Sequence, residues 1–253
     1  MRTEDPSWLE YCDRALLSIE VGREYHARCR ERYIRTASLI EKYATLSASS
    51  SVAEVGPGLL IAMMRLKWGC ECVAYGLLWD SWRRDLSRLG ITAVNWDANE
   101  PLAEGYGSER YDLVLFCEVI EHLNRWPVEV LGDIYRLLRP GGTLILTTVN
   151  FVRLTNRIRM MTGRSPLVNP FEKTQDGSNH IREYTVQELD RYLTKAGFED
   201  LQSELWSFYR AGITGAVARL SGTLIPSVRN YIAIVANKPV GRSGNGSVGV
   251  PNR

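Results

Sequence analysis

The stretch VAEVGPGLL, residues 52–60, decides the fold expected for this chain of 253 residues. Its opening residues predict a buried strand, Gly56 and Gly58 predict a tight turn, and the apolar run from Leu59 predicts a helix. Glycine lets the backbone approach a ligand closely, and a helix N-terminus offers N–H groups to a carboxylate or phosphate. Two glycines in such a turn are weak evidence alone, because many β–α turns bind no ligand.

The chain after this turn alternates apolar strands with amphipathic helices. Such alternation predicts βαβ units and a parallel sheet covered on both faces, whose ligands lie at the carboxyl ends of the strands. We therefore expect an α/β, Rossmann-like, doubly wound sheet of seven strands, mostly parallel, with an antiparallel last strand. The expected strands are 51–56, 70–78, 91–97, 111–120, 143–150, 199–208 and 231–239. The helices between them are expected at 59–69, 80–90, 128–142 and 185–198.

Capping residues mark several expected helix ends. Asp80 is expected as an N-cap and Gly90 as the C′ residue of one helix, while Pro140-Gly141-Gly142 is expected to stop another. Thr185 and Glu188 have the spacing of a capping box. The pattern divides the chain into an N-terminal helical cap (1–49), a cofactor-binding core (50–150), a lid-like insertion on the substrate side (151–184), a closing helix and strand pair (185–238) and a disordered tail (239–253).

Composition narrows the class of protein. The 31 basic and 29 acidic residues give a net charge of +2, so no overall attraction to nucleic acid is expected. The five cysteines form no CxxC pair, which favours reduced thiols over a zinc site. The N-terminus is charged and no apolar run reaches the roughly 18 residues of a membrane span. We expect a soluble, cytoplasmic protein.

Three further motifs follow the glycine turn in a fixed order: NWDANEPL (95–102), YDLVLFCEVIEHL (111–123) and LLRPGGTLILTT (137–148). Together with EVGPG they resemble the motifs of class I S-adenosylmethionine-dependent methyltransferases of the small-molecule branch. HIREYTVQELDRYLTKAGFED (180–200) is similar to a later segment of the same branch, so the resemblance covers residues 50 to about 205. Members of this branch are frequent in glycan and natural-product pathways.

The resemblance implies S-adenosyl-L-methionine as cofactor. It assigns the methionine end to the glycine turn, the adenine to the end of the third strand, and the cofactor or substrate face to the end of the fourth. The implied cofactor residues are Glu54, Gly56, Pro57, Gly58, Trp96, Asp97, Ala98, Cys117 and Glu118. Leu60 replaces the family's third glycine and would push the helix or cofactor outward. No acidic residue follows the second strand for the ribose; Asp80 is the nearest, and it either substitutes or only caps a helix.

EVIEHL concentrates polar groups at the mouth of the fourth strand. His122 has a suitable pKa for a general base that deprotonates a hydroxyl, alone or with His180, or it only hydrogen-bonds backbone. Glu121, Arg182 and Tyr184 are expected to contact substrate, the last two because they alternate with His180 on one face of an extended segment or, alternatively, lie in a solvated loop.

The E-x-x-E-H spacing admits a second interpretation. It resembles the metal-binding set of small-RNA 2′-O-methyltransferases and of some quinone-pathway O-methyltransferases, which here would be Glu118, Glu121 and His122, completed by His180. The motif also occurs in relatives without a metal, so no metal is the primary expectation.

The resulting functional prediction is O-methylation of a small molecule or a sugar or glycan precursor. The alternatives are the metal-dependent RNA 2′-O-methyltransferase and a non-catalytic relative with a degraded cofactor loop. His26 lies between charged residues and is expected at the surface. A run of arginines without acidic residues is expected to be a solvated face, or to contact a phosphate-bearing substrate or a membrane surface: Arg153, Arg157, Arg159 and Arg164.

Overall fold

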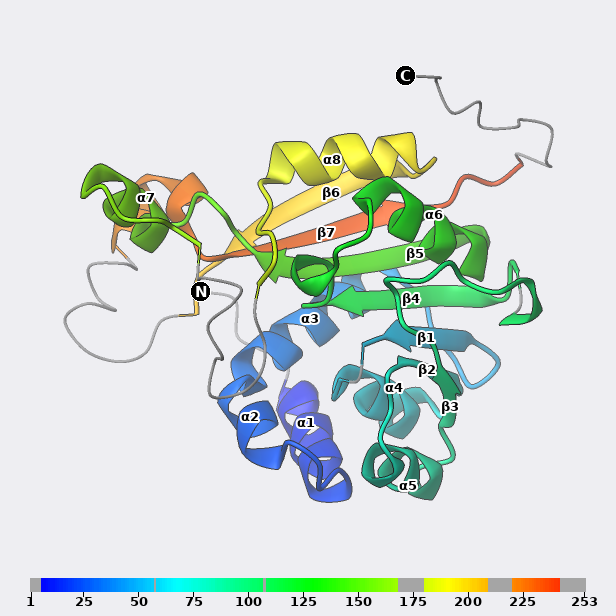
Figure 1. Ribbon diagram of the computed structural model, residues 1–253. Helices are drawn as coiled ribbons and strands as arrows, with labels where there is room; N and C mark the ends of the chain where they lie inside the picture. The colour runs from blue at the N-terminus through cyan, green and yellow to red at the C-terminus, as the bar shows by residue number, and fades with distance from the viewer. Residues whose placement is uncertain (1–5, 57, 107, 168–179, 209–219, 242–253) are drawn as a thin grey trace.

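The computed structural model describes residues 6–56, 58–106, 108–167, 180–208 and 220–241. These residues form a seven-stranded sheet of order β3-β2-β1-β4-β5-β7-β6 (Figure 1). The strands are β1 (Ser51–Val55), β2 (Glu71–Gly76), β3 (Thr92–Asn95), β4 (Tyr111–Cys117), β5 (Leu138–Val149), β6 (Glu199–Trp206) and β7 (Tyr231–Asn237). Pro57 and nearly all of the predicted tail lie outside the described residues.

The strand directions confirm the predicted α/β class. β1 pairs in parallel with β2 and β4, β2 with β3, and β4 with β5. β7 is antiparallel to both of its neighbours, β5 and β6. The strand order reverses between β1 and β4, so the carboxyl ends of these two strands form the switch point at which such sheets bind ligands.

Helices cover both faces of the sheet, as the near-continuous apolar strands require. α1 (Pro6–Ser18), α3 (Arg30–Tyr43), α4 (Leu60–Trp68) and α5 (Asp80–Arg88) share one hydrophobic core with the sheet. α6 (Pro127–Leu137) and α8 (Val186–Lys195) pack on the opposite face (Figure 1). The short helices α2 (Arg23–Arg28) and α7 (Leu154–Met161) lie toward the carboxyl ends of the central strands. The N-terminal helices α1 and α3 therefore belong to the hydrophobic core on one face of the sheet.

Two predicted helix ends are confirmed. Gly90 follows α5 with a φ of +68°, a left-handed conformation that residues with a Cβ rarely adopt. Thr185 caps α8 through its hydroxyl, which accepts the Glu188 N–H, and the Glu188 carboxylate accepts the Thr185 N–H in return. This capping box fixes where the segment carrying His180 enters the helix.

Two other predicted helix ends are wrong. Trp79, not Asp80, is the N-cap of α5, and it makes no side-chain capping bond. α6 ends at Leu137, and the Pro140–Gly142 turn lies inside β5. The reason is a tertiary pairing: the Gly141 N–H donates to the Lys238 carbonyl, and the Lys238 N–H donates to the Gly142 carbonyl. These bonds extend β5 toward its amino end.

The prediction that His26 lies at the surface is also wrong. Its side chain is buried, its Nδ1 lies 2.7 Å from the Tyr33 hydroxyl, and its ring packs edge-on against Trp82. Burial, with the positive charge of Arg32 nearby, lowers the pKa of His26 to about 4. His26 is therefore a neutral packing residue that joins α2, α3 and α5. Across the described residues, no helix is long and apolar enough to cross a membrane.

Candidate active site at the carboxyl ends of β1 and β4

Close contacts explain both described glycines of the turn after β1. Gly56 has a φ of +91°, and a Cβ built there would lie 2.3 Å from a methyl group of Val119. A Cβ at Gly58 would lie 2.1 Å from Oε1 of Glu54. The turn therefore needs glycine at both positions, first for its backbone conformation and then for the carboxyl group packed against it.

Glu54 supplies the polar partner at the start of α4. Its Oε2 accepts the Ile61 N–H at 3.0 Å, which satisfies one of the amides that a helix leaves unpaired at its N-terminus. The side chain is 2% exposed, and this burial raises the pKa of Glu54 to about 8. Glu54 is therefore a proton-holding group at neutral pH, placed directly beneath the glycine turn.

A small cavity of about 100 Å³ lies above this turn. The structure brings together in its wall five of the predicted cofactor residues: Glu54, Gly56, Gly58, Cys117 and Glu118. Four further lining residues come from elements that the sequence analysis did not connect with the cofactor: Tyr25, Arg32, Tyr33 and Thr36. The helices α2 and α3 thus form one side of this cavity.

Arg32 is the most informative residue that the sequence analysis missed. Its guanidinium lies 3.0 Å from Glu118 Oε2 and 3.3 Å from the Tyr25 hydroxyl. Thr147 donates to the other carboxylate oxygen of Glu118 at 2.9 Å, and the Glu118 backbone has a φ of +56°. The available sequence signal was an arginine one turn before the buried Thr36, on the face of α3 that otherwise packs into the core.

Leu60 and the end of β2 are the two places where the sequence departs from the motifs that it resembles. Leu60 is the first residue of α4, is 1% exposed and lines the cavity. β2 ends at Gly76, so its end is not shifted toward the exposed Asp80. The residues between them include Leu77 and Trp79, which are 59% and 72% exposed. Exposed apolar side chains therefore lie between the end of β2 and Asp80.

The predicted adenine residues after β3 occupy a tight turn. Asp97 Oδ1 accepts both the backbone N–H and the side-chain amide of Asn99. Trp96 is 5% exposed and donates its indole N–H to the Glu100 carbonyl, and Ala98 is also buried. Asp97 itself is half-buried, and its adenine role stays a prediction.

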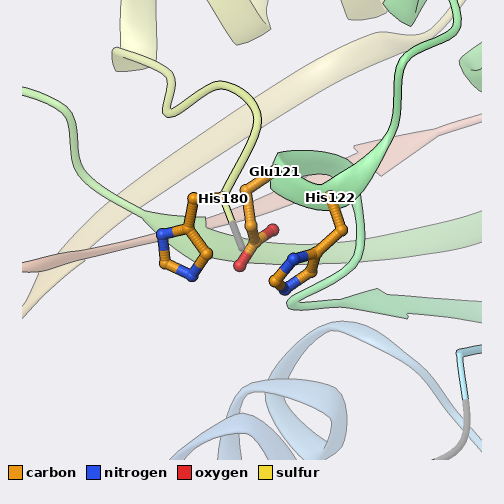
Figure 2. A group of neighbouring side chains, drawn as sticks. All are labelled: Glu121, His122 and His180. Carbon is orange, nitrogen blue, oxygen red and sulfur yellow. The ribbon is translucent and has the colours of Figure 1, made fainter. Parts of the chain in front are cut away.

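A second group of polar side chains lies just beyond β4. Glu121 and His122 belong to the short 3₁₀ turn Ile120–His122, and His180 comes from the segment that leads to α8. Figure 2 shows the three side chains pointing toward one another. One ligand atom from each lies within 4.8 Å of the other two, and the two imidazole centroids are 5.0 Å apart. We call this group the Glu121–His122–His180 cluster.

Backbone and side-chain bonds hold the cluster in place. The Glu121 carbonyl accepts the N–H groups of Ile181 and Arg182, which ties the two segments together. Thr148 donates to Glu121 Oε2 at 2.8 Å, next along β5 from the Thr147 that holds Glu118. Burial raises the pKa of Glu121 to about 8, and the nearby Glu118 carboxylate adds to the shift. Glu121 Oε1 is buried without a hydrogen-bond partner among the described residues.

The prediction that Arg182 and Tyr184 share one substrate-facing side with His180 is wrong for Tyr184. Tyr184 is 1% exposed and packs in the core beneath α8. Arg182 lies over the Tyr184 ring and pairs with Glu188. The segment bends because its 181 and 182 amides bond to the Glu121 carbonyl, so the alternation of an extended strand does not apply.

The four arginines of 153–164 do not form one face. Arg153 makes a bidentate ion pair with the buried Glu183. Arg157 donates to the Val152 carbonyl and the Ser227 hydroxyl. The prediction of a continuous solvated face is therefore wrong for these two. Arg159 and Arg164 are exposed.

The sheet order and the glycine turn define the Rossmann-like class of class I methyltransferases. A family described as "Methyltransferase domain" matches residues 23–203, so the chain belongs to this family. A "Probable S-adenosylmethionine-dependent methyltransferase" of Mycolicibacterium smegmatis is 36% identical over 115 residues, which are 45% of this chain and 38% of that protein. The chain thus matches well under half of this relative's length.

Solved structures agree on the fold. A methyltransferase from Archaeoglobus fulgidus described as S-adenosylmethionine-dependent superposes with a TM-score of 0.57 at 17% identity, over 81% of this chain and 92% of that one. Phosphoethanolamine N-methyltransferase 2 of Haemonchus contortus, solved with S-adenosyl-L-methionine, superposes with a TM-score of 0.56 at 15% identity, over 81% of this chain and 52% of that one. The predicted family and cofactor, S-adenosylmethionine, are confirmed. The glycine turn, the helix N-terminus and the cavity described above fit the methionine end of that cofactor.

Proposed function

We propose that the protein transfers a methyl group to a hydroxyl oxygen of a small molecule, a sugar or a glycan precursor. S-adenosylmethionine, when bound, supplies an electrophilic methyl group on a sulfonium centre. The chain must then align the acceptor oxygen and take up its proton, because an aliphatic hydroxyl is a weak nucleophile. The observation that supports this function is the Glu121–His122–His180 cluster immediately after the cavity-lining end of β4.

Each half of the site has a separate task in this proposal. Glu54, Gly56 and Gly58 hold the methionine end, and the Arg32–Glu118 pair closes that side of the pocket. The cluster faces the acceptor, and His122 is the proposed proton acceptor, because an imidazole nitrogen is the group whose basicity suits this task near neutral pH. His180 is the second imidazole in reach of the same proton.

Calorimetric titration with S-adenosylhomocysteine tests the cofactor half. Wild type is expected to bind one equivalent, and Asp97→Ala is expected to bind at least tenfold more weakly if its carboxylate receives the adenine amino group. Equal affinity of the two proteins would reject the role of Asp97. Failure of wild type to bind would reject the enzyme and favour the non-catalytic alternative.

Formation of S-adenosylhomocysteine from S-adenosylmethionine with a panel of hydroxyl compounds tests the acceptor half. We expect turnover with hydroxyl acceptors in wild type and a loss of at least 100-fold in kcat for His122→Asn, with cofactor affinity unchanged. Turnover of amines alone would contradict transfer to oxygen.

A further inference from the structure

The buried carboxylate of Glu121 is only partly hydrogen-bonded by the described residues. It is 1% exposed, its Oε2 accepts one hydrogen bond from Thr148, and its Oε1 has no partner among the described residues. Within the same residues it makes no ion pair, whereas Glu118 has Arg32 and Glu183 has Arg153. A buried carboxylate is stable when it is paired with a cation, hydrogen-bonded or metal-bound. The groups beside it are two imidazoles, which bind metals in their neutral form.

We propose that Glu121, His122 and His180 bind one divalent metal ion. Three ligand atoms within 4.8 Å of one another come close to the spacing that one cation imposes, since ligands at about 2.1 Å from a metal lie roughly 3–4 Å apart. The two half-buried imidazoles lie on either side of the Glu121 carboxylate (Figure 2), and their rotation toward it would close the remaining difference. The backbone bonds between Glu121 and residues 181 and 182 keep both parts of the site at this distance.

The support around His180 is typical of a metal ligand. Its Nδ1 lies 3.0 Å from Glu183 Oε1, which leaves Nε2 as the atom for the cation. Glu183 is itself buried and held by Arg153 and Asn156. A carboxylate that accepts from the second nitrogen of a histidine fixes the ring orientation and increases the basicity of the coordinating nitrogen.

Glu118 is not part of this set. Its two oxygens are bonded to Arg32 and to Thr147, so binding a metal would require breaking a buried ion pair. The proposed site therefore has two nitrogen ligands and one oxygen ligand from the protein. This donor set suits first-row cations such as Mn²⁺, Fe²⁺, Co²⁺ and Zn²⁺ better than Mg²⁺ or Ca²⁺, which prefer oxygen alone.

Three protein ligands leave coordination positions open, as in catalytic rather than structural metal sites. This part of the inference rests on the proposed function: the open positions fit an acceptor with two neighbouring oxygens, such as a vicinal diol or an α-hydroxy acid. A hydroxyl bound to the cation would be acidified by it and would release its proton to solvent before the oxygen accepts the methyl group. His122 would then serve as a ligand instead of a base, so the two roles are alternatives that an experiment separates.

Cobalt binding tests the site without any acceptor. Protein treated with EDTA and dialysed is titrated with Co²⁺, with visible absorption and calorimetry as readouts. Wild type is expected to bind one equivalent with new absorption bands. His122→Asn, His180→Asn and Glu121→Gln are each expected to weaken binding at least 100-fold, and Glu183→Gln roughly 10- to 100-fold. Circular dichroism confirms that each variant is folded.

Two matched controls sharpen the result. His26→Asn removes the other histidine of the chain, which lies away from the cluster, and is expected to change cobalt affinity less than threefold. Glu118→Gln is expected to do the same, and a large loss there would overturn the three-ligand assignment. No cobalt binding by wild type, or unchanged binding by both His122→Asn and His180→Asn, would overturn the site itself.

The same samples distinguish this inference from the proposed function. Methyl transfer to a hydroxyl that continues in excess EDTA would reject the metal and keep the enzyme. Cobalt binding without turnover of any hydroxyl acceptor would keep the metal and reject the proposed transfer. A higher kcat/KM for vicinal diols than for matched mono-alcohols, abolished by EDTA, is expected if the acceptor binds the cation.

Discussion

Replacing Arg32 by methionine removes the guanidinium that lies 3.0 Å from Glu118. Both side chains are largely desolvated, with 10% and 12% of their surface exposed. At this separation and an effective dielectric constant of about 20, the attraction is roughly 5 kcal/mol. Arg32→Met leaves Glu118 with Thr147 as its remaining bonded partner in the described site. We expect the free energy of unfolding to fall by about 3–5 kcal/mol.

The double-mutant cycle separates the pair from the packing around it. Glu118→Gln is expected to cost about as much as Arg32→Met, because it leaves a buried guanidinium uncompensated. The double variant carries neither charge, so it is expected to be more stable than the sum of the single effects predicts. The coupling energy is expected to be about 3 kcal/mol or more.

Urea unfolding followed by circular dichroism and tryptophan fluorescence measures each free energy. The control is the same cycle on the surface pair Glu10 and Arg14. Their charged groups lie 3.8 Å apart, and their side chains are 69% and 49% exposed. Exposed pairs of this kind contribute about 0.5 kcal/mol or less. A coupling between Arg32 and Glu118 no larger than that of the surface pair would refute the conclusion that α3 closes a desolvated pocket.

Two other predictions concern Glu54 and the turn above it. Gly58→Ala places a Cβ 2.1 Å from the carboxyl that caps α4, so calorimetry is expected to show at least tenfold weaker S-adenosylhomocysteine binding. Gly105→Ala is the control, because a Cβ there meets open space, and it is expected to bind S-adenosylhomocysteine as tightly as wild type does. The pKa of Glu54 is raised from 4.5 to about 8, so its favourable contribution is full below pH 4.5 and is lost as pH rises to about 8. Wild type is therefore expected to lose stability as pH rises from 5 to 9, whereas Glu54→Gln, which does not titrate, is not. Urea unfolding is expected to show the difference in unfolding free energy shifting by about 5 kcal/mol in favour of the variant over this range, and a pH-independent difference would contradict this.

The sequence predicted the sheet because its strands are encoded locally. Most of the parallel strands are apolar runs bounded by turn residues, and their alternation with helices predicts the parallel sheet. The strand order comes from the structure. The start of β5 could not be predicted in this way, because Gly141 and Gly142 are held by Lys238, almost a hundred residues further along the chain. A local pattern of proline and glycines indicated a helix stop, and a distant strand made it part of the sheet.

The site was predictable to the same extent. Glu54 lies near the end of β1, and Gly58 and Glu118 follow β1 and β4, so their meeting at one edge follows from the fold. Arg32 comes from a helix before the first strand, 86 residues from its partner, and no spacing in the sequence indicates that contact. His26 was misassigned for a related reason, since its neighbours in sequence are charged while its neighbours in space, Tyr33 and Trp82, are aromatic.

The two carboxylates of EVIEHL have opposite electrostatic settings, although they are three residues apart. Glu118 meets a guanidinium supplied by α3 on the cofactor side. Glu121 meets a threonine hydroxyl and two imidazoles, with one oxygen left unpartnered. The first charge is therefore balanced by Arg32, whereas the second has no ion-pair partner among the described residues, so that a proton or a cation from solution would balance it. This difference predicts that Glu118→Gln changes cofactor affinity and folding stability, whereas Glu121→Gln changes cobalt affinity and acceptor turnover. Variants that failed to separate in this way would show that the motif acts as a single unit.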